Sequence, residues 1–201
     1  MITIVDYGIG NLGSIANMFK RIGAPAEVTG DPARIAAAGK ILLPGVGAFD
    51  SAIERIDAAR LRPVLHRKAL EDRIPILGIC LGMQLLTRGS EEGRLPGLGW
   101  IAADTVRFPA LAGLKVPHMG WNLVRQTRPS ALTAGLGSDA RFYFVHSYHV
   151  RADDPRDAIL RVHHGVEFDA AIQSGNIYGA QFHPEKSHRF GMQLLTNFAK
   201  L

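Results

Sequence analysis

The sequence predicts an α/β protein whose mixed, mostly parallel sheet is flanked by helices and extended by antiparallel strands. Over the first 90 residues, short apolar runs alternate with stretches of helical periodicity, a pattern typical of parallel strands joined by helices. Beyond residue 100, short strand candidates follow one another across Gly and Asp turns, and a helical stretch ends the sequence. At 201 residues, the chain has the length of one domain, so we expect residues 1–201 to form a single unit.

The first elements are short and clearly bounded. Ile2–Val5 is an apolar run rich in β-branched residues and is predicted to be a buried strand. Asn11–Ile22 has apolar residues at helical spacing, and Gly23 is placed to end that helix. Ala26–Thr29 and Ile41–Leu43 are the next strand candidates, and a Pro-Gly pair is expected to end the latter.

A long helical pattern and a third apolar strand follow. Asp50–Leu70 has helical periodicity throughout, and Pro63 is expected to kink or divide it, because proline removes a helical hydrogen bond. Ile74–Ile79 is an apolar strand that leads into Cys80, after which a helical stretch runs to Leu86.

The second half of the sequence predicts a different organisation. Its apolar runs are too short for helices, so we expect antiparallel strands added to the sheet or packed beside it. The strand candidates are Thr105–Phe108, Asn122–Val124, Arg141–Val145, Ile159–Val162, Phe168–Gln173 and Ile177–Phe182. A final helix is predicted over His188–Ala199.

Composition excludes several classes of protein. With 47% hydrophobic and 20% charged residues, the chain resembles neither disordered nor fibrous proteins, and no apolar run is long enough to span a membrane. The net charge of +5 is scattered along the chain, which argues against a nucleic-acid partner. The single cysteine, Cys80, excludes an intrachain disulfide and fits a reducing compartment, so we expect a cytoplasmic protein.

Cys80 stands in a pattern typical of a nucleophile elbow. Gly78 and Gly82 bracket it where a strand is predicted to turn into a helix, and a turn this sharp leaves no room for flanking side chains. Such a turn places the sulfur at a helix N-terminus, which favours a thiolate. The alternative is that Cys80 is a small buried hydrophobic residue. The flanking glycines favour the nucleophile.

A candidate general base and its orienting acid close the last strand. His183 and Glu185 lie two residues apart, so in extended backbone both side chains point to one face, and the carboxylate can orient the imidazole. The alternative is a surface His-Pro-Glu turn without chemistry. Together with the elbow, the pattern predicts a Cys80–His183–Glu185 triad.

Two backbone amides are candidates for an oxyanion hole. The N–H of Leu81 follows the nucleophile directly. The second is the N–H of Val46, in a Pro-Gly-Val-Gly loop expected at the same carboxyl edge of the sheet, where glycines on both sides let the peptide turn. Taken alone, this loop is better explained as an ordinary strand-to-helix turn.

Other patterns carry weaker signals. Gly8–Gly13 matches a G-x-G-x-x-G dinucleotide fingerprint, with Asp31 roughly where a ribose-binding acid would lie. A single match of this kind is a weak indication. The histidine pairs have no third ligand at convincing spacing, so we expect no metal and no cofactor. His118 and Trp121 are either a substrate-binding pair or loop residues packed under the site.

These motifs together resemble a known family. The Cys-centred elbow, the Pro-Gly-x-Gly loop and the terminal His-Pro-Glu are similar to those of class I glutamine amidotransferases, and the whole set resembles the glutaminase subunits of imidazole glycerol-phosphate synthases. The segments that carry this resemblance are Asp6–Leu12, Pro44–Phe49, Gly78–Leu86, Pro117–Asn122, Phe144–Tyr148 and Phe182–Ser187.

The resemblance implies an activity and a set of substrate contacts. It implies that glutamine is hydrolysed to glutamate and ammonia, with Cys80 as nucleophile, His183 as proton carrier and Glu185 as its support. The family's glutamine-binding positions correspond here to Gly47, Gln84, Glu92, Ser147 and Tyr148. The Glu92 carboxylate suits the ammonium group of the substrate.

A partner is expected on two grounds. A glutaminase of this length leaves no room for an acceptor domain, and ammonia released into water is protonated and lost as a nucleophile. The resemblance implies a (β/α)8-barrel cyclase subunit, which makes imidazole glycerol phosphate and an aminoimidazole carboxamide ribotide in histidine biosynthesis. By the same resemblance, Asn11, Tyr143 and Lys186 would face that barrel.

Two alternative functions stay open. One is a glutaminase of the same class that serves another synthase, for example in surface-sugar amination. The other is a binding subunit that keeps the fold without catalysis, against which the intact Cys80, His183 and Glu185 argue.

Overall fold

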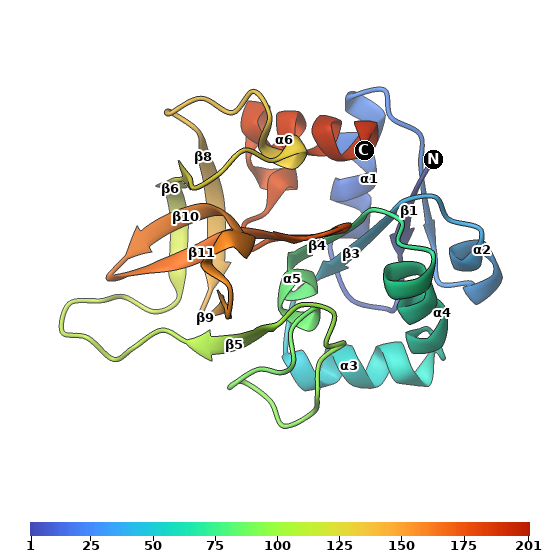
Figure 1. Cartoon of the computed structure of the whole chain (residues 1–201), viewed down its shortest axis with the longest axis horizontal. Helices are drawn as coiled ribbons and strands as arrows, with labels where there is room; N and C mark the ends of the chain where they lie inside the picture. Colours follow the sequence, from blue (N-terminus) through green and yellow to red (C-terminus); the bar gives the residue numbers. More distant parts are fainter.

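The computed structural model describes residues 1–201 and is built on a ten-stranded sheet (Figure 1). Its first part is parallel: helices join β1, β2, β3 and β4 in turn, and β12, which follows the antiparallel strand β11, pairs in parallel with β4. These parallel strands, in their order across the sheet, are β2 (Ala26–Thr29), β1 (Ile2–Val5), β3 (Ile41–Gly45), β4 (Ile76–Cys80) and β12 (Ile177–Ala180).

Antiparallel strands extend the sheet beyond β12, and two more form a separate sheet. The extension consists of β11 (Val166–Ser174), β10 (Ala158–His164), β7 (Arg125–Gln126), β9 (Tyr148–Ala152) and β5 (Ala103–Arg107). The separate two-stranded sheet is made by β6 (His118–Leu123) and β8 (Arg141–His146). Both predicted arrangements of the second half, added to the sheet and packed beside it, are therefore present.

Helices cover both faces of the sheet, so each face has its own apolar core. One face is covered by α1 (Leu12–Arg21) and α6 (His188–Lys200), and Phe19 and Phe198 are fully buried there. The other face is covered by α2 (Pro32–Ala36), α3 (Phe49–Ala58), α4 (Arg62–His66) and α5 (Leu81–Leu85). The predicted fold class is confirmed.

The long helix predicted over Asp50–Leu70 is broken earlier than expected. α3 ends at Ala58, and Arg60 adopts a φ of 55°, which a helix does not allow. Pro63 stands in the first turn of α4, where its missing N–H costs no helical hydrogen bond. α4 then continues into a π-helical turn over Arg67–Glu71.

The prediction that Pro44 ends the third strand is wrong, since β3 runs through Gly45. The pairing of β3 with β1 stops at Leu42, so the strand at Pro44 has a neighbour only in β4. Proline is tolerated at such a local edge because no ladder hydrogen bond on the open side is lost.

The expectation of purely antiparallel strands is wrong at β12. This strand pairs in parallel with β4 and antiparallel with β11, and so joins the two halves of the sheet. The short elements α2, β7 and β9 were not predicted. Four further one-turn segments complete the backbone: 3-10 turns at Ala131–Thr133, Pro155–Asp157 and Pro184–Lys186, and the π-helical turn above.

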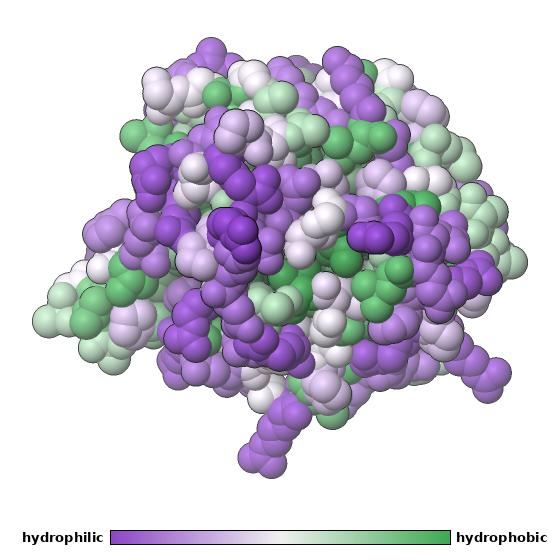
Figure 2. Space-filling view, in the orientation of Figure 1, coloured by the Kyte–Doolittle hydropathy of each residue, from purple (hydrophilic) through white to green (hydrophobic).

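The surface contains one projecting apolar loop, between β5 and β6 (Figure 2). Leu111 and Val116 are exposed on it, at 47% and 38% of their surface. None of the helices combines the length and the apolar character that a membrane span requires.

Candidate active site

Cys80 stands at a strained turn between β4 and α5. Its φ of 53° and ψ of −110° are unusual for a non-glycine residue and typical of a nucleophile elbow. A Cβ added to Gly78 would lie 2.5 Å from the Gly82 carbonyl oxygen, and one added to Gly82 would lie 1.9 Å from the Leu43 carbonyl oxygen. The two glycines are therefore required because backbone passes directly against them.

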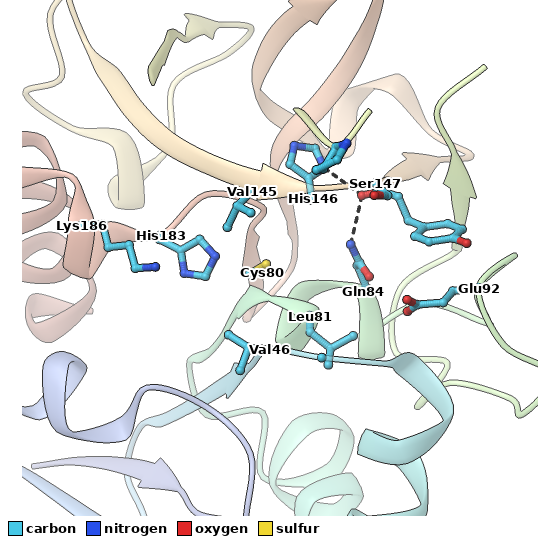
Figure 3. Close-up of a pocket in the computed structure, with 13 residues that line it drawn as sticks. Val46, Cys80, Leu81, Gln84, Glu92, Val145, His146, Ser147, His183 and Lys186 are labelled. Carbon is cyan, nitrogen blue, oxygen red and sulfur yellow. Dashed lines mark hydrogen bonds between the residues drawn. The ribbon is translucent and has the colours of Figure 1, made fainter. Parts of the chain in front are cut away.

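Parallel pairing of β4 with β12 brings His183 to Cys80. Ile79 is opposite Ala180 in this pairing, so the residues that follow each strand emerge side by side at one edge of the sheet. His183 is 2% exposed, and its ring lies beside the Cys80 sulfur (Figure 3). Residues 103 positions apart in the sequence thus meet through a single strand pairing.

Glu185 supports His183, although not by the geometry that the sequence suggested. Beyond β12 the backbone does not stay extended, and Pro184–Lys186 forms a 3-10 turn. That turn folds the Glu185 carboxylate back, so that the Nδ1 of His183 lies 2.8 Å from its Oε1. Both side chains are almost fully buried, at 3% and 2% exposure.

The electrostatics of His183 favour its charged form. Burial lowers its pKa, but the neighbouring Cys80 and Glu185 outweigh burial and raise the pKa to about 9. The Nε2 of His183 has no hydrogen-bond partner within the protein. An imidazole held on Nδ1, with Nε2 free beside a sulfur, is placed to move a proton between that sulfur and a bound reactant.

The loop between β3 and α3 is anchored at both ends. The Tyr7 hydroxyl donates a hydrogen bond to the Pro44 carbonyl, and the backbone N–H of Phe49 donates to the Glu92 carboxylate at 3.0 Å. Between these anchors, Val46 and Gly47 make no hydrogen bond, and Gly47 has a φ of 101°. The N–H of Val46 therefore has no competing hydrogen bond, while the loop is held on both sides.

A cavity of about 350 Å³ opens beside Cys80. Its lining includes the predicted nucleophile, base, oxyanion-hole residues and glutamine-binding residues, but not Glu185 (Figure 3). These lining residues are Val46, Gly47, Cys80, Leu81, Gln84, Glu92, Pro117, Val145, His146, Ser147, Tyr148, His183 and Lys186. Every residue predicted for the nucleophile, base, oxyanion hole and substrate contacts thus borders one space, in which their individual roles stay predictions.

The three predicted interface residues lie around this cavity rather than together in it. Lys186 lines it, and its Nζ is 5.7 Å from the ring centroid of Tyr143, on β8. Asn11 stands at the N-cap position of α1 without a capping hydrogen bond, its side chain is exposed, and it does not line the cavity.

Several residues at the site escaped sequence reasoning. His146 is buried against the cavity, and Gln181, fully buried, donates from Nε2 to the Cys80 sulfur at 3.8 Å. Tyr7 is 4% exposed, and burial, followed by the charge of Cys80, raises the pKa of its hydroxyl. Only the tertiary structure reveals these, because each belongs to a strand or loop remote in sequence from Cys80.

The dinucleotide fingerprint has a different role. The Asp31 carboxylate accepts a hydrogen bond from the Ala33 N–H and so caps α2. A Cβ added to Gly13 would meet nothing within 4 Å, whereas the third glycine of a true fingerprint is needed for close helix–strand packing. This pattern is therefore a strand-to-helix turn without the packing that a dinucleotide site requires.

The comparisons with known proteins agree with this geometry. The family model for glutamine amidotransferase class I matches residues 3–201. The chain is 50% identical to imidazole glycerol phosphate synthase subunit HisH 2 of Methanococcus maripaludis, over 100% of this chain and 99% of that protein. It is 47% identical to subunit HisH of Bdellovibrio bacteriovorus, over the full length of both.

Solved structures show the same fold at low sequence identity. A crystal structure of a glutamine amidotransferase matches over 100% of both chains, with a TM-score of 0.76 and 17% identity. The structure of PurLQS from Thermotoga maritima holds a chain that matches over 99% of this chain and 97% of that one, with a TM-score of 0.73 and 19% identity. With the elbow, the loop and the His-Pro-Glu turn assembled at one cavity, the chain belongs to the class I glutamine amidotransferase family, and within it to the imidazole glycerol phosphate synthase HisH subunits.

Proposed function

We propose that Cys80, His183 and Glu185 hydrolyse glutamine to glutamate and ammonia in the cavity beside the elbow. The observation that carries this proposal is the buried His183, held on Glu185 at 2.8 Å with its free nitrogen toward Cys80. Cys80 thiolate attacks the side-chain amide carbon of glutamine, and the carbonyl oxygen becomes an oxyanion. Protonated His183 then gives its proton to the amide nitrogen, ammonia leaves, and a thioester remains on Cys80.

The second half of the reaction uses the same groups in reverse. Neutral His183 takes a proton from water, whose oxygen attacks the thioester carbon. The tetrahedral intermediate collapses to glutamate, and Cys80 leaves as the thiolate. In both halves the backbone N–H of Leu81 and the reoriented N–H of Val46 would stabilise the oxyanion. The absence of any hydrogen bond at Val46 supports this role, because its N–H has no competing acceptor in the protein.

The cavity walls offer complementary charge for the rest of the substrate. Glu92 is an exposed carboxylate at the cavity and would meet the ammonium group of glutamine. The Ser147–Tyr148 backbone would meet its carboxylate, and Gln84 and Gly47 would line the stem. Glu92 also holds the first N–H of α3, so it has a second, structural task.

We further propose that the ammonia passes to a (β/α)8-barrel cyclase subunit, where imidazole glycerol phosphate and an aminoimidazole carboxamide ribotide are made. Exposed apolar side chains support a partner on this side of the molecule. Met119, Trp121 and Leu123 alternate along β6 at 63%, 45% and 58% exposure, and their buried neighbour His118 lies against the cavity wall residue His146. Apolar strips of this kind on a short sheet are typical of partner surfaces.

Glutamate release from glutamine tests the proposal directly. It is measured with and without the candidate cyclase and its ribonucleotide ligand, for the native chain, Cys80→Ala and the control His163→Asn, whose side chain is exposed. We expect strong stimulation by the cyclase, abolished by Cys80→Ala and unchanged by His163→Asn. The absence of glutamate under every condition, with folded protein, would leave a binding subunit instead.

A second synthase remains a specific alternative. Robust glutaminase activity with no response to the cyclase would keep the triad and assign the chain to another acceptor, such as a sugar-aminating synthase.

A further inference from the structure

A chain of hydrogen bonds begins at the half-buried Asn122 on β6 and ends at the Cys80 sulfur. Its first link is the side-chain amide of Asn122, whose Nδ2 lies 3.2 Å from the Nε2 of His118. The same Asn122 nitrogen donates to the carbonyl of His163 at 3.1 Å, which fixes the orientation of the amide. Because Asn122 presents a donor, His118 must accept at Nε2 and carry its proton on Nδ1.

The direction set at Asn122 propagates through two histidines. The Nδ1 of His118 lies 3.0 Å from the Nε2 of His146, so this N–H donates and His146 accepts. His146 then carries its own proton on Nδ1, which lies 2.8 Å from the Tyr148 carbonyl oxygen. Each ring has only one arrangement that satisfies both neighbours, so both tautomers are determined.

The Tyr148 carbonyl is where this chain reaches the cavity. It accepts from His146 and also from the Nε2 of Gln84, at 3.1 Å, and the two contacts converge in Figure 3. The second proton of that Gln84 amide is donated to the Oε1 of Gln181 at 3.2 Å. Gln181 is thereby turned so that its own Nε2 donates to the Cys80 sulfur at 3.8 Å.

Burial makes each link of this chain matter. His118, His146, Gln84 and Gln181 are at most 6% exposed, so a lost hydrogen bond costs more here than it would at the surface. Burial, with the neighbouring histidines as a smaller cause, lowers the pKa of His118 to about 4 and that of His146 to about 3. Both rings are therefore neutral near pH 7. They must be neutral, because each ring donates one hydrogen bond from Nδ1 and accepts one at Nε2.

We propose that His118 and His146 are positioning residues for glutamine hydrolysis, which hold the Tyr148 carbonyl and, through Gln84 and Gln181, the surroundings of the Cys80 sulfur. This inference rests on the proposed function, because the Ser147–Tyr148 backbone is assigned there to the substrate. It also gives a role to the Pro117–Asn122 segment, whose exposed residues belong to the proposed partner surface.

His118→Phe is the decisive substitution. Phenylalanine can keep the stacking of this ring on Phe144 and His164, with centroids at 4.7 and 4.1 Å, but it has no donor for His146. His146 is then free to move its proton to Nε2, which turns a lone pair toward the Tyr148 carbonyl. Since the affected backbone binds substrate, we expect the KM for glutamine to rise about tenfold, as for one lost buried hydrogen bond, with kcat changed less than about threefold.

His164→Phe is the matched control. His164 stacks on His118, but its Nε2 contacts the Lys115 carbonyl at 2.8 Å and takes no part in the hydrogen bonds that lead to Cys80. A merely structural role for the cluster predicts the same small kinetic change for both variants. We expect KM and kcat of His164→Phe to stay within about twofold of the native values, since no buried donor is lost at the cavity. Asn122→Leu, at a half-buried position, provides a second variant if His118→Phe does not fold.

NMR of the ring nitrogens, in protein labelled with ¹⁵N-histidine and at pH 7, tests this series of hydrogen bonds without any activity assay. We expect Nδ1–H tautomers for His118 and His146, and loss of the fixed tautomer of His146 in His118→Phe or Asn122→Leu. Nε2–H tautomers in the native protein, or an unchanged KM in both folded variants, would overturn the proposal. A native protein with the expected tautomers but no glutaminase activity would refute the proposed function and leave the hydrogen-bonded chain in place.

Discussion

At the scale of single residues, Glu185 is the most informative position of the triad. Its Oε1 contacts His183 at 2.8 Å, while its Oε2 is buried without a hydrogen-bond partner. An amide nitrogen at the Oε2 position would displace no donor, so Glu185→Gln removes the negative charge at nearly constant shape. We expect kcat to fall about a hundredfold or more, because an uncharged partner no longer stabilises the imidazolium.

The measurement is the steady-state kinetics of glutamate release in the complex with the cyclase. We expect the KM for glutamine to change little, since Glu185 does not line the cavity. We also expect the pKa of His183, raised to about 9 in the native protein, to fall, because one of the two groups that raise it is neutralised. A kcat within threefold of the native value would show that Glu185 is only a packing residue.

Tyr7 is the corresponding test for the oxyanion loop. Its hydroxyl holds the Pro44 carbonyl, one peptide before the Gly45–Val46 peptide that must present its N–H. Tyr7→Phe keeps the buried ring and releases this anchor. We expect kcat to fall about fivefold with little change in KM, since a donor to the oxyanion acts mainly in the transition state. Tyr178→Phe, which loses a hydroxyl contact with Gln173 outside the cavity, is the control.

At the scale of the elements, the elbow depends on how closely β3 approaches α5. A Cβ at residue 82 would lie 1.9 Å from the Leu43 carbonyl oxygen, so Gly82→Ala forces β3 and α5 apart. We expect the free energy of unfolding to fall by more than about 3 kcal/mol, as for severe overpacking. Gly13→Ala, in α1 with open space at its Cβ, should raise it by up to about 1 kcal/mol. Urea denaturation measures the free energy of unfolding of both variants. Equal changes would contradict the conclusion that Gly82 is required by the close approach of β3 to α5.

The elements also show where sequence reasoning succeeds and where it fails. β1, α1, β2 and α6 were predicted within one or two residues at each boundary, because each combines a clear apolar period with a turn residue or the end of the chain. The five-residue α2 is too short to show a helical period, and the break at Arg60 occurs at a residue with no turn signal. β9 was missed because Tyr148 follows β8 after one residue, so the sequence gives no separate boundary.

The site divides in the same way. Cys80, His183 and the Pro44–Gly47 loop belong to local patterns with chemical meaning, so they were accessible from sequence. The contact between His183 and Glu185 was expected from extended backbone but is made by a 3-10 turn, which the pattern does not specify. The polar chain from Asn122 was inaccessible, because His118 and His146 meet only through the β6–β8 pairing.

At the scale of the whole molecule, buried histidines set how stability depends on pH. His118, His146 and His149 all have a lowered pKa in the folded state, with burial as the main cause, to about 4 for His118 and about 3 for His146. Unfolded, each titrates near about 6.5. Below that pH these histidines bind protons in the unfolded protein but not in the folded protein. The free energy of unfolding therefore falls as the pH falls, by about 1.4 kcal/mol for each histidine and each pH unit.

His183 acts in the opposite direction and in another pH range. Its folded-state pKa is raised to about 9, so its protonation stabilises the fold fully below the unfolded value near about 6.5 and is lost as the pH rises through about 9. The two effects together place the maximum of the unfolding free energy close to about pH 6.5, between the two titration ranges.

We expect urea midpoints to fall on both sides, toward pH 5 and toward pH 9. His118→Phe should reduce the slope on the acid side only, and His183→Asn the slope on the alkaline side only. A midpoint that stays constant between pH 6.5 and pH 5 would mean that the buried histidines are protonated in the folded protein, and would contradict the single direction of donation on which the chain to Cys80 depends.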